Sequence, residues 1–292
     1  MLAGYRLVSV LVRWIPDRAG RRLFRFIGSL FGYCDRTRRH YVTRHVLRVR
    51  GSGLSQKERR KAVGEVFASY AEYWFRSFRL PGMAPEDLES RFTIEGYHHV
   101  IEARESGPGP ILALPHLGCW EWAGFWLSRI QGLEVAAVAE EINPPELFAW
   151  FVDLRAKFGL TIIPLDSQAG VSVLKAIAGG QVVCLLSDRL VGGTGIDVKF
   201  FGETTSIPAG PAVLALRSGA PIIPVGVYDT PNGCHAIVRP PIGVRRTGKF
   251  RDDVTQMTED LVVELEILIR HDPSQWHLLQ PNWPSDQKSL KG

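Results

Sequence analysis

Several features that mark common protein classes are missing from this chain of 292 residues. Its four cysteines are scattered, without a CxxC pair or histidine-rich spacing, which predicts neither a disulfide framework nor a zinc site and favours a reducing compartment. No apolar run reaches the roughly 18–20 residues that cross a bilayer. There is no GxSxG nucleophile elbow, and the glycine-rich stretch 191–195 lacks the lysine of a P-loop. Serine hydrolases and P-loop enzymes are therefore poor matches.

Lysine is absent from residues 1–50, and acidic residues are scarce there. This segment contains twelve arginines and only two acidic residues, Asp17 and Asp35. Its net charge is therefore +10, whereas that of the whole chain is +5. The arginines alternate with apolar side chains that include Val10, Leu11, Trp14, Phe24 and Phe26. Such a pattern favours helices lying in the headgroup layer of an anionic membrane. A solvated helix packed on the domain is the alternative, and no nucleic-acid-binding signature accompanies the arginines.

The order of helical and strand-like patterns along the rest of the chain predicts an α/β protein. Residues 1–80 read as a helical segment, packed on and continuous with a domain that spans residues 81–292. In that second part, strand-like runs at 111–114, 135–138, 161–164, 182–186, 221–228 and 235–238 alternate with helical patterns at 120–130, 144–158, 170–178, 209–218 and 252–271. Alternation of this kind indicates a largely buried central sheet that is flanked by helices.

His116 and Glu121 are the most informative pair for chemistry. The apolar run 111–114 ends before a proline, His116 follows that proline directly, and the acid comes five residues later. On one continuous helix these two side chains would point about 140° apart, so they meet only if the histidine lies in a loop and the acid in the next helix's first turn. The carboxylate would then orient a general base. A histidine that only caps a strand end is the alternative.

A resemblance to a known family begins at this motif. The segment 116–121, HLGCWE, resembles the His-x4-Asp/Glu block of bacterial acyltransferases that acylate lipid A or phosphatidylinositol mannosides. Residues 138–144, 154–164, 187–189 and 200–211 resemble further blocks of that family in the same order. Residues 69–81 are similar to the actinobacterial phosphatidylinositol mannoside acyltransferases. The pair Asp188-Arg189 also favours the mannoside branch, because the lipid A branch often has Asp-Gln or Asp-His there.

The resemblance implies an acyl-CoA-dependent transferase without a cofactor or metal. His116 would take a proton from a sugar hydroxyl of a mannosylated phosphatidylinositol lipid, with Glu121 assisting, and CoA would leave as thiolate. It also implies that Asp188 belongs to the substrate-binding set. The location expected is peripheral, on the cytoplasmic side of the cell inner membrane or plasma membrane.

Other candidate residues allow two interpretations. Arg155 and Arg189 suit a phosphate of CoA or of the lipid acceptor, or they form surface ion pairs. Glu140 is a candidate for binding sugar hydroxyls, although Glu141 beside it leaves the register open. Cys119 is expected to be a packing residue. The aromatic residues that follow His116 either line an acyl tunnel or fill the core; they are Trp120, Trp122, Phe125 and Trp126.

Two further functions stay open at this stage. A lipid A-type or lysophospholipid acyltransferase would use the same histidine and acid on another acceptor. A non-catalytic lipid-binding protein would depend on the basic N-terminal segment alone, with a structural His116.

Overall fold

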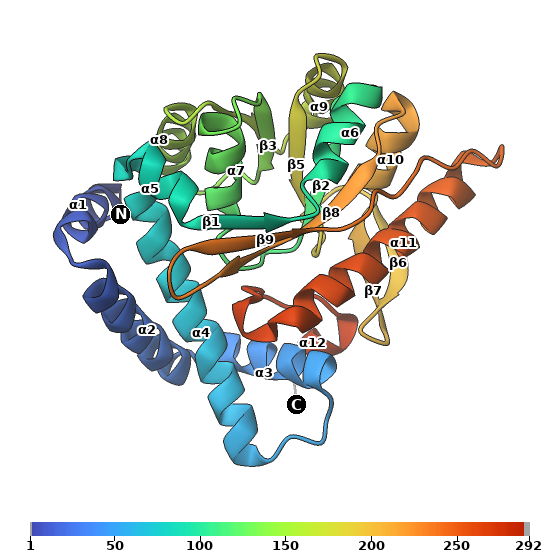
Figure 1. Ribbon diagram of the computed structural model, residues 1–292. Helices are drawn as coiled ribbons and strands as arrows, with labels where there is room; N and C mark the ends of the chain where they lie inside the picture. The colour runs from blue at the N-terminus through green and yellow to red at the C-terminus, as the bar shows by residue number, and fades with distance from the viewer. Residues whose placement is uncertain (1, 289–292) are drawn as a thin grey trace.

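A seven-stranded sheet in the order β1-β9-β8-β2-β5-β3-β4 forms the centre of the molecule in the computed structural model, which describes residues 2–288 (Figure 1). The strands are β1 (Phe92–Glu95), β2 (Ile111–Leu114), β3 (Val135–Ala139), β4 (Leu160–Pro164), β5 (Val182–Leu186), β8 (Ile222–Asp229) and β9 (Cys234–Val238). The five strands from β8 to β4 are parallel, and β9 is antiparallel to β8. Neighbouring parallel strands end at one edge, so the residues after β2, β5 and β3 lie near one another.

Helices cover both faces of this sheet, which confirms the expected α/β class. One apolar core lies between the sheet and α9, α10 and α11, and a second lies between the opposite face and α5, α6 and α7. The helix bounds are α5 (Pro85–Ser90), α6 (His98–Ser106), α7 (Trp120–Arg129), α8 (Pro145–Ala156), α9 (Ala169–Ala178), α10 (Gly210–Ser218) and α11 (Phe250–His271). Strand β2 is buried on both sides, as its unbroken apolar sequence ILAL predicts.

A β-hairpin that is missing from the predicted strands precedes α10. Strands β6 (Gly195–Phe200) and β7 (Glu203–Pro208) pair antiparallel, and Phe201 and Gly202 make the turn with φ of 50° and 80°. Phe200 and Phe201 pack into the core beneath the hairpin. Alternation was weak here because the glycines and Pro208 favoured a turn, so β6, β7 and the short β1 were absent from the predicted strands.

Four helices precede the sheet: α1 (Leu2–Trp14), α2 (Asp17–Cys34), α3 (Arg36–Arg50) and α4 (Gln56–Arg79). Helix α4 starts with the capping box of Ser55 and Glu58 that its sequence indicates. Helix α2 lies close along α4 because three glycines face it: a Cβ at Gly20, Gly28 or Gly32 would come within 2.4 Å of Phe75 or Phe67 atoms. Among the described residues, no helix is long and apolar enough to cross a membrane.

The chain ends in a segment that returns to the sheet edge. We call residues 273–288 the C-terminal segment; it contains the 3-10 helix η2 (Pro273–Gln275) and α12 (Pro284–Lys288). Helix α12 lies beside α3 (Figure 1), where Asp286 pairs with Arg44, His45 and Arg48. The C-terminal segment is thereby fixed to the N-terminal helices, and its middle part reaches the carboxyl ends of β2 and β5.

Candidate active site

His116 lies at the carboxyl end of β2 and pairs with Asp188 at the carboxyl end of β5. The two strands are parallel neighbours in which Leu114 is level with Leu186, so their following loops start side by side. Nδ1 of His116 lies 2.6 Å from Oδ1 of Asp188, and the backbone N–H of His116 donates to Oδ2 at 3.1 Å. Because the carboxylate accepts from Nδ1–H, Nε2 keeps its lone pair, which is the form a general base needs.

Asp188 is completely buried and is held by further donors. The indole N–H of Trp276 donates to Oδ2 at 2.7 Å, and the Asn282 side-chain amide donates to the backbone carbonyl of Asp188 at 3.1 Å. Burial alone would raise the pKa of Asp188, but the charge of His116 and the hydrogen bonds from His116 and Trp276 outweigh it and lower that pKa. Asp188 is therefore a buried anion whose charge faces the histidine.

Glu121 has a different partner from the one that the sequence predicted. Its carboxylate accepts hydrogen bonds from Nε of Arg155 at 3.0 Å and from the Nη2 of the same guanidinium, and both side chains are largely buried. Burial alone would lower the pKa of Arg155, but the charge of Glu121 raises it above the usual value. The expected hydrogen bond between Glu121 and His116 is absent among the described residues, so the predicted pairing was wrong: Asp188 is the acid that contacts the histidine.

The loop after His116 explains this change of partner. Gly118 has φ of 53°, and a Cβ there would lie 2.3 Å from the carbonyl oxygen of Val227. Leu117 forms an isolated antiparallel bridge with Trp276, and the Gly118 N–H donates to the Gln275 carbonyl at 3.0 Å. The loop is therefore pinned on β8 and the C-terminal segment, and His116 faces β5 while Glu121, in the first turn of α7, faces the end of α8.

Arg189 and Glu140 form an ion pair at the rim of the same edge. Nη2 of Arg189 lies 2.8 Å from Oε2 of Glu140, which follows β3, and Nη1 donates to the Gln280 side chain at 2.7 Å. Glu140 is about half exposed. Of the predicted substrate-binding residues, Arg155 is thus a buried partner of Glu121, whereas Glu140 and Arg189 lie next to Asp188 at the surface.

His277, which the sequence did not single out, is a neighbour of the pair of His116 and Asp188. Its backbone N–H donates to the carbonyl of His116 at 2.8 Å, and its Nε2 lies 2.9 Å from the Ser69 hydroxyl. Burial, together with the charge of His116, lowers the pKa of His277 to about 3, so this ring is neutral at ordinary pH. Trp276, Gln280 and Asn282 were missed as well. One sequence signal could have indicated them: residues 273–284, after the last long helix, are rich in tryptophan and proline although no further long helix or strand is predicted there.

Comparison with known proteins adds to this geometry. The family model described as bacterial lipid A biosynthesis acyltransferase matches residues 4–285. The chain belongs to this family. A phosphatidylinositol mannoside acyltransferase of Mycolicibacterium smegmatis is 36% identical over 222 residues, which cover 75% of this chain and 71% of that protein. Proteins of the same name from two strains of Mycobacterium tuberculosis are 35% identical over 223 residues, covering 75% of this chain and 69% of theirs.

These findings confirm the family that the sequence motifs indicated, and the three mycobacterial relatives are named for its mannoside branch. As a member of the lipid A biosynthesis acyltransferase family, the chain is an acyltransferase.

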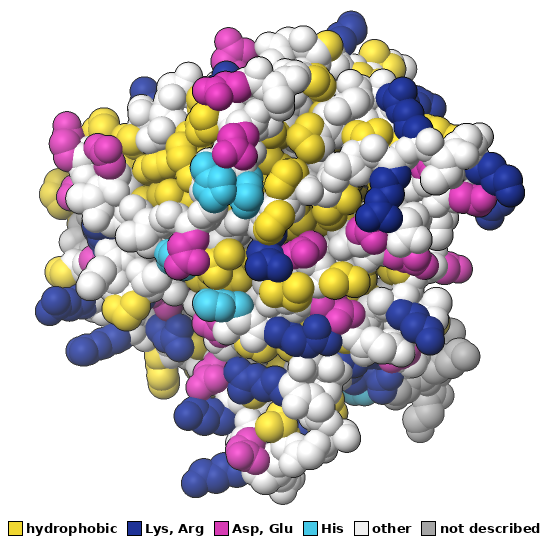
Figure 2. Space-filling model, turned by 45° about the vertical axis from the view of Figure 1, so that its right-hand side comes forward, with side chains coloured by type: hydrophobic (Ala, Val, Ile, Leu, Met, Phe, Trp, Pro, Cys, Tyr) yellow, Lys and Arg dark blue, Asp and Glu magenta, His cyan; other side chains and the backbone are white. Residues whose placement is uncertain are grey.

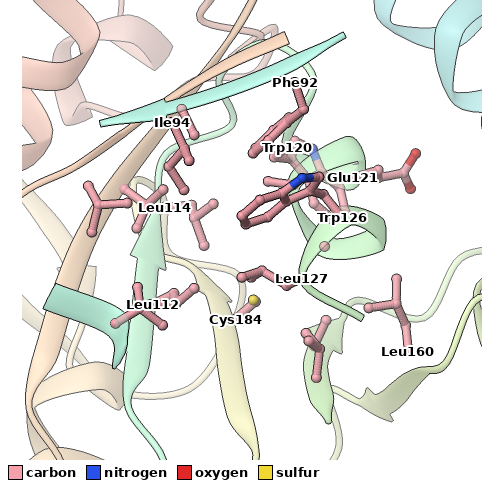
Figure 3. A pocket seen from close by; sticks show the side chains of 18 residues that line it. Phe92, Ile94, Leu112, Leu114, Trp120, Glu121, Trp126, Leu127, Leu160 and Cys184 are labelled. Carbon is pink, nitrogen blue, oxygen red and sulfur yellow. The ribbon is translucent and has the colours of Figure 1, made fainter. Parts of the chain in front are cut away.

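An apolar cavity lies between α7 and the face of the sheet that α5, α6 and α7 cover (Figure 3). It is lined mainly by aliphatic and aromatic side chains, including Phe92, Leu112, Leu114, Trp120, Trp126 and Leu160. Glu121 borders it with its carboxylate pointing away from the cavity (Figure 3). Of the four aromatic residues singled out in the sequence, Trp120 and Trp126 line the cavity, and Trp122 and Phe125 are buried in the surrounding core.

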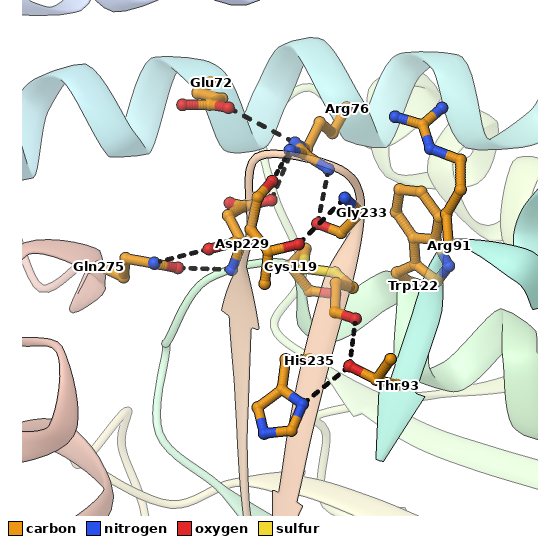
Figure 4. The surroundings of a disulfide bond; sticks show 12 residues. Glu72, Arg76, Arg91, Thr93, Cys119, Trp122, Asp229, Gly233, His235 and Gln275 are labelled. Carbon is orange, nitrogen blue, oxygen red and sulfur yellow. Dashed lines mark hydrogen bonds and ion pairs between the residues drawn. A yellow bond between two sulfur atoms is a disulfide. The ribbon is translucent and has the colours of Figure 1, made fainter.

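Cys119 and Cys234 form a disulfide that joins the loop after His116 to the start of β9 (Figure 4). The sequence did not predict this pairing, because 115 residues separate the cysteines and only the fold brings their Cα atoms to 6.7 Å. Asp229 completes a group of potential metal ligands among the described residues. Both sulfurs are in the disulfide, however, and Asp229 pairs with Nε of Arg76 at 2.9 Å, so these donors are already engaged.

Proposed function

We propose that this acyltransferase moves a fatty acyl chain from acyl-CoA to a sugar hydroxyl of a mannosylated phosphatidylinositol, with His116 as general base. The observation that carries the proposal is the 2.6 Å contact between Nδ1 of His116 and the buried carboxylate of Asp188. It leaves Nε2 free to accept a proton, and it stabilises the imidazolium that results. The names of the mycobacterial relatives support the choice of acceptor.

The proposed reaction is a direct transfer. Nε2 of His116 takes the proton of the sugar hydroxyl while its oxygen attacks the thioester carbonyl, so a C–O bond forms and the C–S bond breaks. CoA leaves as thiolate, and the proton held by the imidazolium neutralises it. No covalent enzyme intermediate is needed, which agrees with the absence of a GxSxG serine from the sequence. No cofactor or metal takes part in this scheme.

The other predicted residues receive distinct roles in this proposal. Glu121 and Arg155 act as a buried pair that fixes the start of α7 against the end of α8, rather than as contacts of the reacting atoms. Arg189 and Glu140 lie at the open rim beside Asp188, where a guanidinium suits a phosphate and a carboxylate suits sugar hydroxyls. The apolar cavity behind Trp120 has a volume of only about 40 Å³, so we assign to it one end of the acyl chain and not the whole chain.

Membrane attachment through α1 and α2 is part of the proposal. Large hydrophobic side chains are exposed on these two helices, and ten of the sixteen most exposed in the described part of the chain lie there: Val8, Val10, Leu11, Trp14, Leu23, Phe26, Ile27, Leu30, Phe31 and Tyr33. Soluble surfaces rarely gather so many apolar groups. Arg and Lys side chains are prominent in the lower part of Figure 2, at the height of α3 and the start of α4 in Figure 1. Together they suit the cytoplasmic face of an anionic inner or plasma membrane.

The decisive experiment measures thiol release from acyl-CoA by the full-length protein on anionic vesicles. Phosphatidylinositol mannoside, unmannosylated phosphatidylinositol, a lysophospholipid and a lipid A precursor are compared as acceptors, and the lipid products are identified by mass spectrometry. We expect release that depends on the mannosylated acceptor. Transfer to the lysophospholipid or to the lipid A precursor instead would show that the enzyme uses one of these alternative acceptors. Binding without turnover would indicate a lipid-binding protein, and turnover without any acceptor would indicate hydrolysis.

A further inference from the structure

Asp188 accepts hydrogen bonds on both carboxylate oxygens, and one donor comes from the C-terminal segment. Oδ1 faces Nδ1 of His116, whereas Oδ2 accepts from the Trp276 indole N–H at 2.7 Å and from the His116 backbone N–H at 3.1 Å. A carboxylate that is held at Oδ2 by two donors cannot rotate about its χ2 angle without losing them. The indole thus determines where Oδ1 points.

Trp276 is itself held rigidly. The side chain is almost fully buried, and its ring lies 5.7 Å from the ring of Phe201, 5.6 Å from that of His45 and 6.3 Å from that of Trp283. The backbone on either side of it binds the loop that carries the histidine, through the bridge between Leu117 and Trp276 and the hydrogen bond from His277 to His116. One short stretch of chain therefore contacts both members of the pair.

We propose that Trp276 is a positioning residue for the general base. Its indole N–H fixes the orientation of the Asp188 carboxylate, and the negative charge of that carboxylate is then divided between two donors, Trp276 and His116. This inference rests on the proposed function of His116. An anion that accepts one hydrogen bond fewer is a stronger base, so without the indole N–H the carboxylate would hold the imidazolium proton more tightly. Trp276 therefore tunes the pH at which His116 becomes an effective base, as well as its orientation.

Trp276→Phe tests this idea because it keeps an aromatic ring and removes the donor. We expect kcat to fall about tenfold, in line with the loss of a hydrogen bond to a charged group, with KM for acyl-CoA and acceptor little changed. The acidic limb of the pH profile should move to higher pH. Trp283→Phe is the matched control: Trp283 is equally buried and donates its indole N–H to the backbone carbonyls of Phe200 and Glu203 at 3.2 Å, away from Asp188.

Two results would overturn the proposal: an unchanged kcat and pH limb in Trp276→Phe, or the same shift of the limb in Trp283→Phe, which would indicate a general packing effect. A second measurement on the wild-type protein does not depend on the variant folding. With the eight tryptophans labelled with ¹⁵N, one indole N–H resonance should move as His116 titrates and stop moving in His116→Ala. Absence of such a resonance would also contradict the inference. The NMR titration needs no turnover, so it separates a failure of this contact from a failure of the proposed acyl transfer.

Discussion

At the scale of single residues, the proton transfer that we propose for His116 depends on which ring nitrogen carries the hydrogen. The buried carboxylate of Asp188 assigns the hydrogen to Nδ1, and the side chain of His116 is partly exposed, so the other nitrogen can meet a substrate. A histidine in a loop at a strand end also contributes little to the core. Its removal should therefore affect chemistry more than folding.

His116→Ala should lower the rate of acyl transfer about 10²–10⁴-fold, the usual contribution of a general base. The protein should still fold, with a lower melting temperature because the buried carboxylate of Asp188 loses a partner. Thiol release from acyl-CoA and thermal unfolding followed by circular dichroism measure the two effects. His235→Ala is a suitable control, because His235 is also a partly exposed histidine with an acidic neighbour, Glu95. Near-normal turnover by folded His116→Ala would remove the general base from the mechanism.

The pair of Glu121 and Arg155 should behave as a unit. Removing one partner of a buried ion pair leaves an uncompensated charge and costs about 3–5 kcal/mol, so Glu121→Gln and Arg155→Met should each destabilise the fold strongly. The double variant should recover much of that loss, because neither charge is then left alone. Urea unfolding of the four proteins in a double-mutant cycle measures the coupling. Additive losses would show that the two side chains do not act together.

At the scale of elements, the C-terminal segment connects the N-terminal helices to the sheet edge that carries His116 and Asp188. Its far end is fixed by Asp286, which is fully buried and accepts from Arg44 at 2.8 Å and from the backbone N–H groups of Asn282 and Trp283 at 3.0 and 3.1 Å. Its middle part places Trp276 against Asp188, the partner of His116. Weakening the contacts of Asp286 should therefore disturb the position of Trp276, because both residues belong to the same short segment.

Asp286 should make the protein sensitive to acid. Burial alone would raise the pKa of Asp286, but hydrogen bonds from His45, Arg44 and two backbone amides hold it well below the usual range. A lowered pKa means that the stabilisation is complete above the unfolded carboxyl pKa of about 3.9 and is lost as the pH falls below it. Asp286→Asn should lower the unfolding free energy at pH 7 by about 3 kcal/mol and weaken its acid dependence.

Denaturant unfolding between pH 2.5 and 7 measures this dependence. Asp252→Asn, at an exposed aspartate of α11, is the control and should change little. An Asp286→Asn protein with wild-type stability and the same acid profile would contradict the role of this anchor.

At the scale of the whole molecule, the N-terminal helices have one packed face and one exposed apolar face. Gly20, Gly28 and Gly32 bring α2 against Phe67 and Phe75 of α4, so deleting residues 1–30 would uncover the core as well as remove a membrane contact. Substitution of exposed side chains separates these two effects better than truncation does.

The double variant Trp14→Ser with Phe26→Ser should bind anionic vesicles at least about tenfold more weakly, since burying one large apolar side chain contributes about 1.5–3 kcal/mol. These side chains are 84% and 68% exposed, so the fold should be unaffected. Val263→Ser, at a 59% exposed position of α11, is the control. Vesicle co-sedimentation at low and high salt measures binding, which should weaken with salt. Unchanged binding by the double variant would show that α1 and α2 are not the contact.

The sequence alone was sufficient for the class of fold, most of the long elements and the family. Buried parallel strands such as β2 and β5 are continuous apolar runs, and the capping box of α4 is a local pattern, so both are visible without tertiary information. The motif at 116–121 marked the histidine that we propose as general base, because the family block that it resembles has a histidine and an acid at this spacing.

Only the tertiary structure decided which side chains meet. The partner of His116 is Asp188, 72 residues away, because β5 inserts beside β2 while α7 carries Glu121 toward Arg155. Cys119 and Cys234, and Trp276 with Asp188, are likewise brought together across 115 and 88 residues. Spacing along the chain determines the geometry of neighbours within a helix or turn. Contacts between loops at a sheet edge depend instead on strand order, which is set by the packing of the whole sheet.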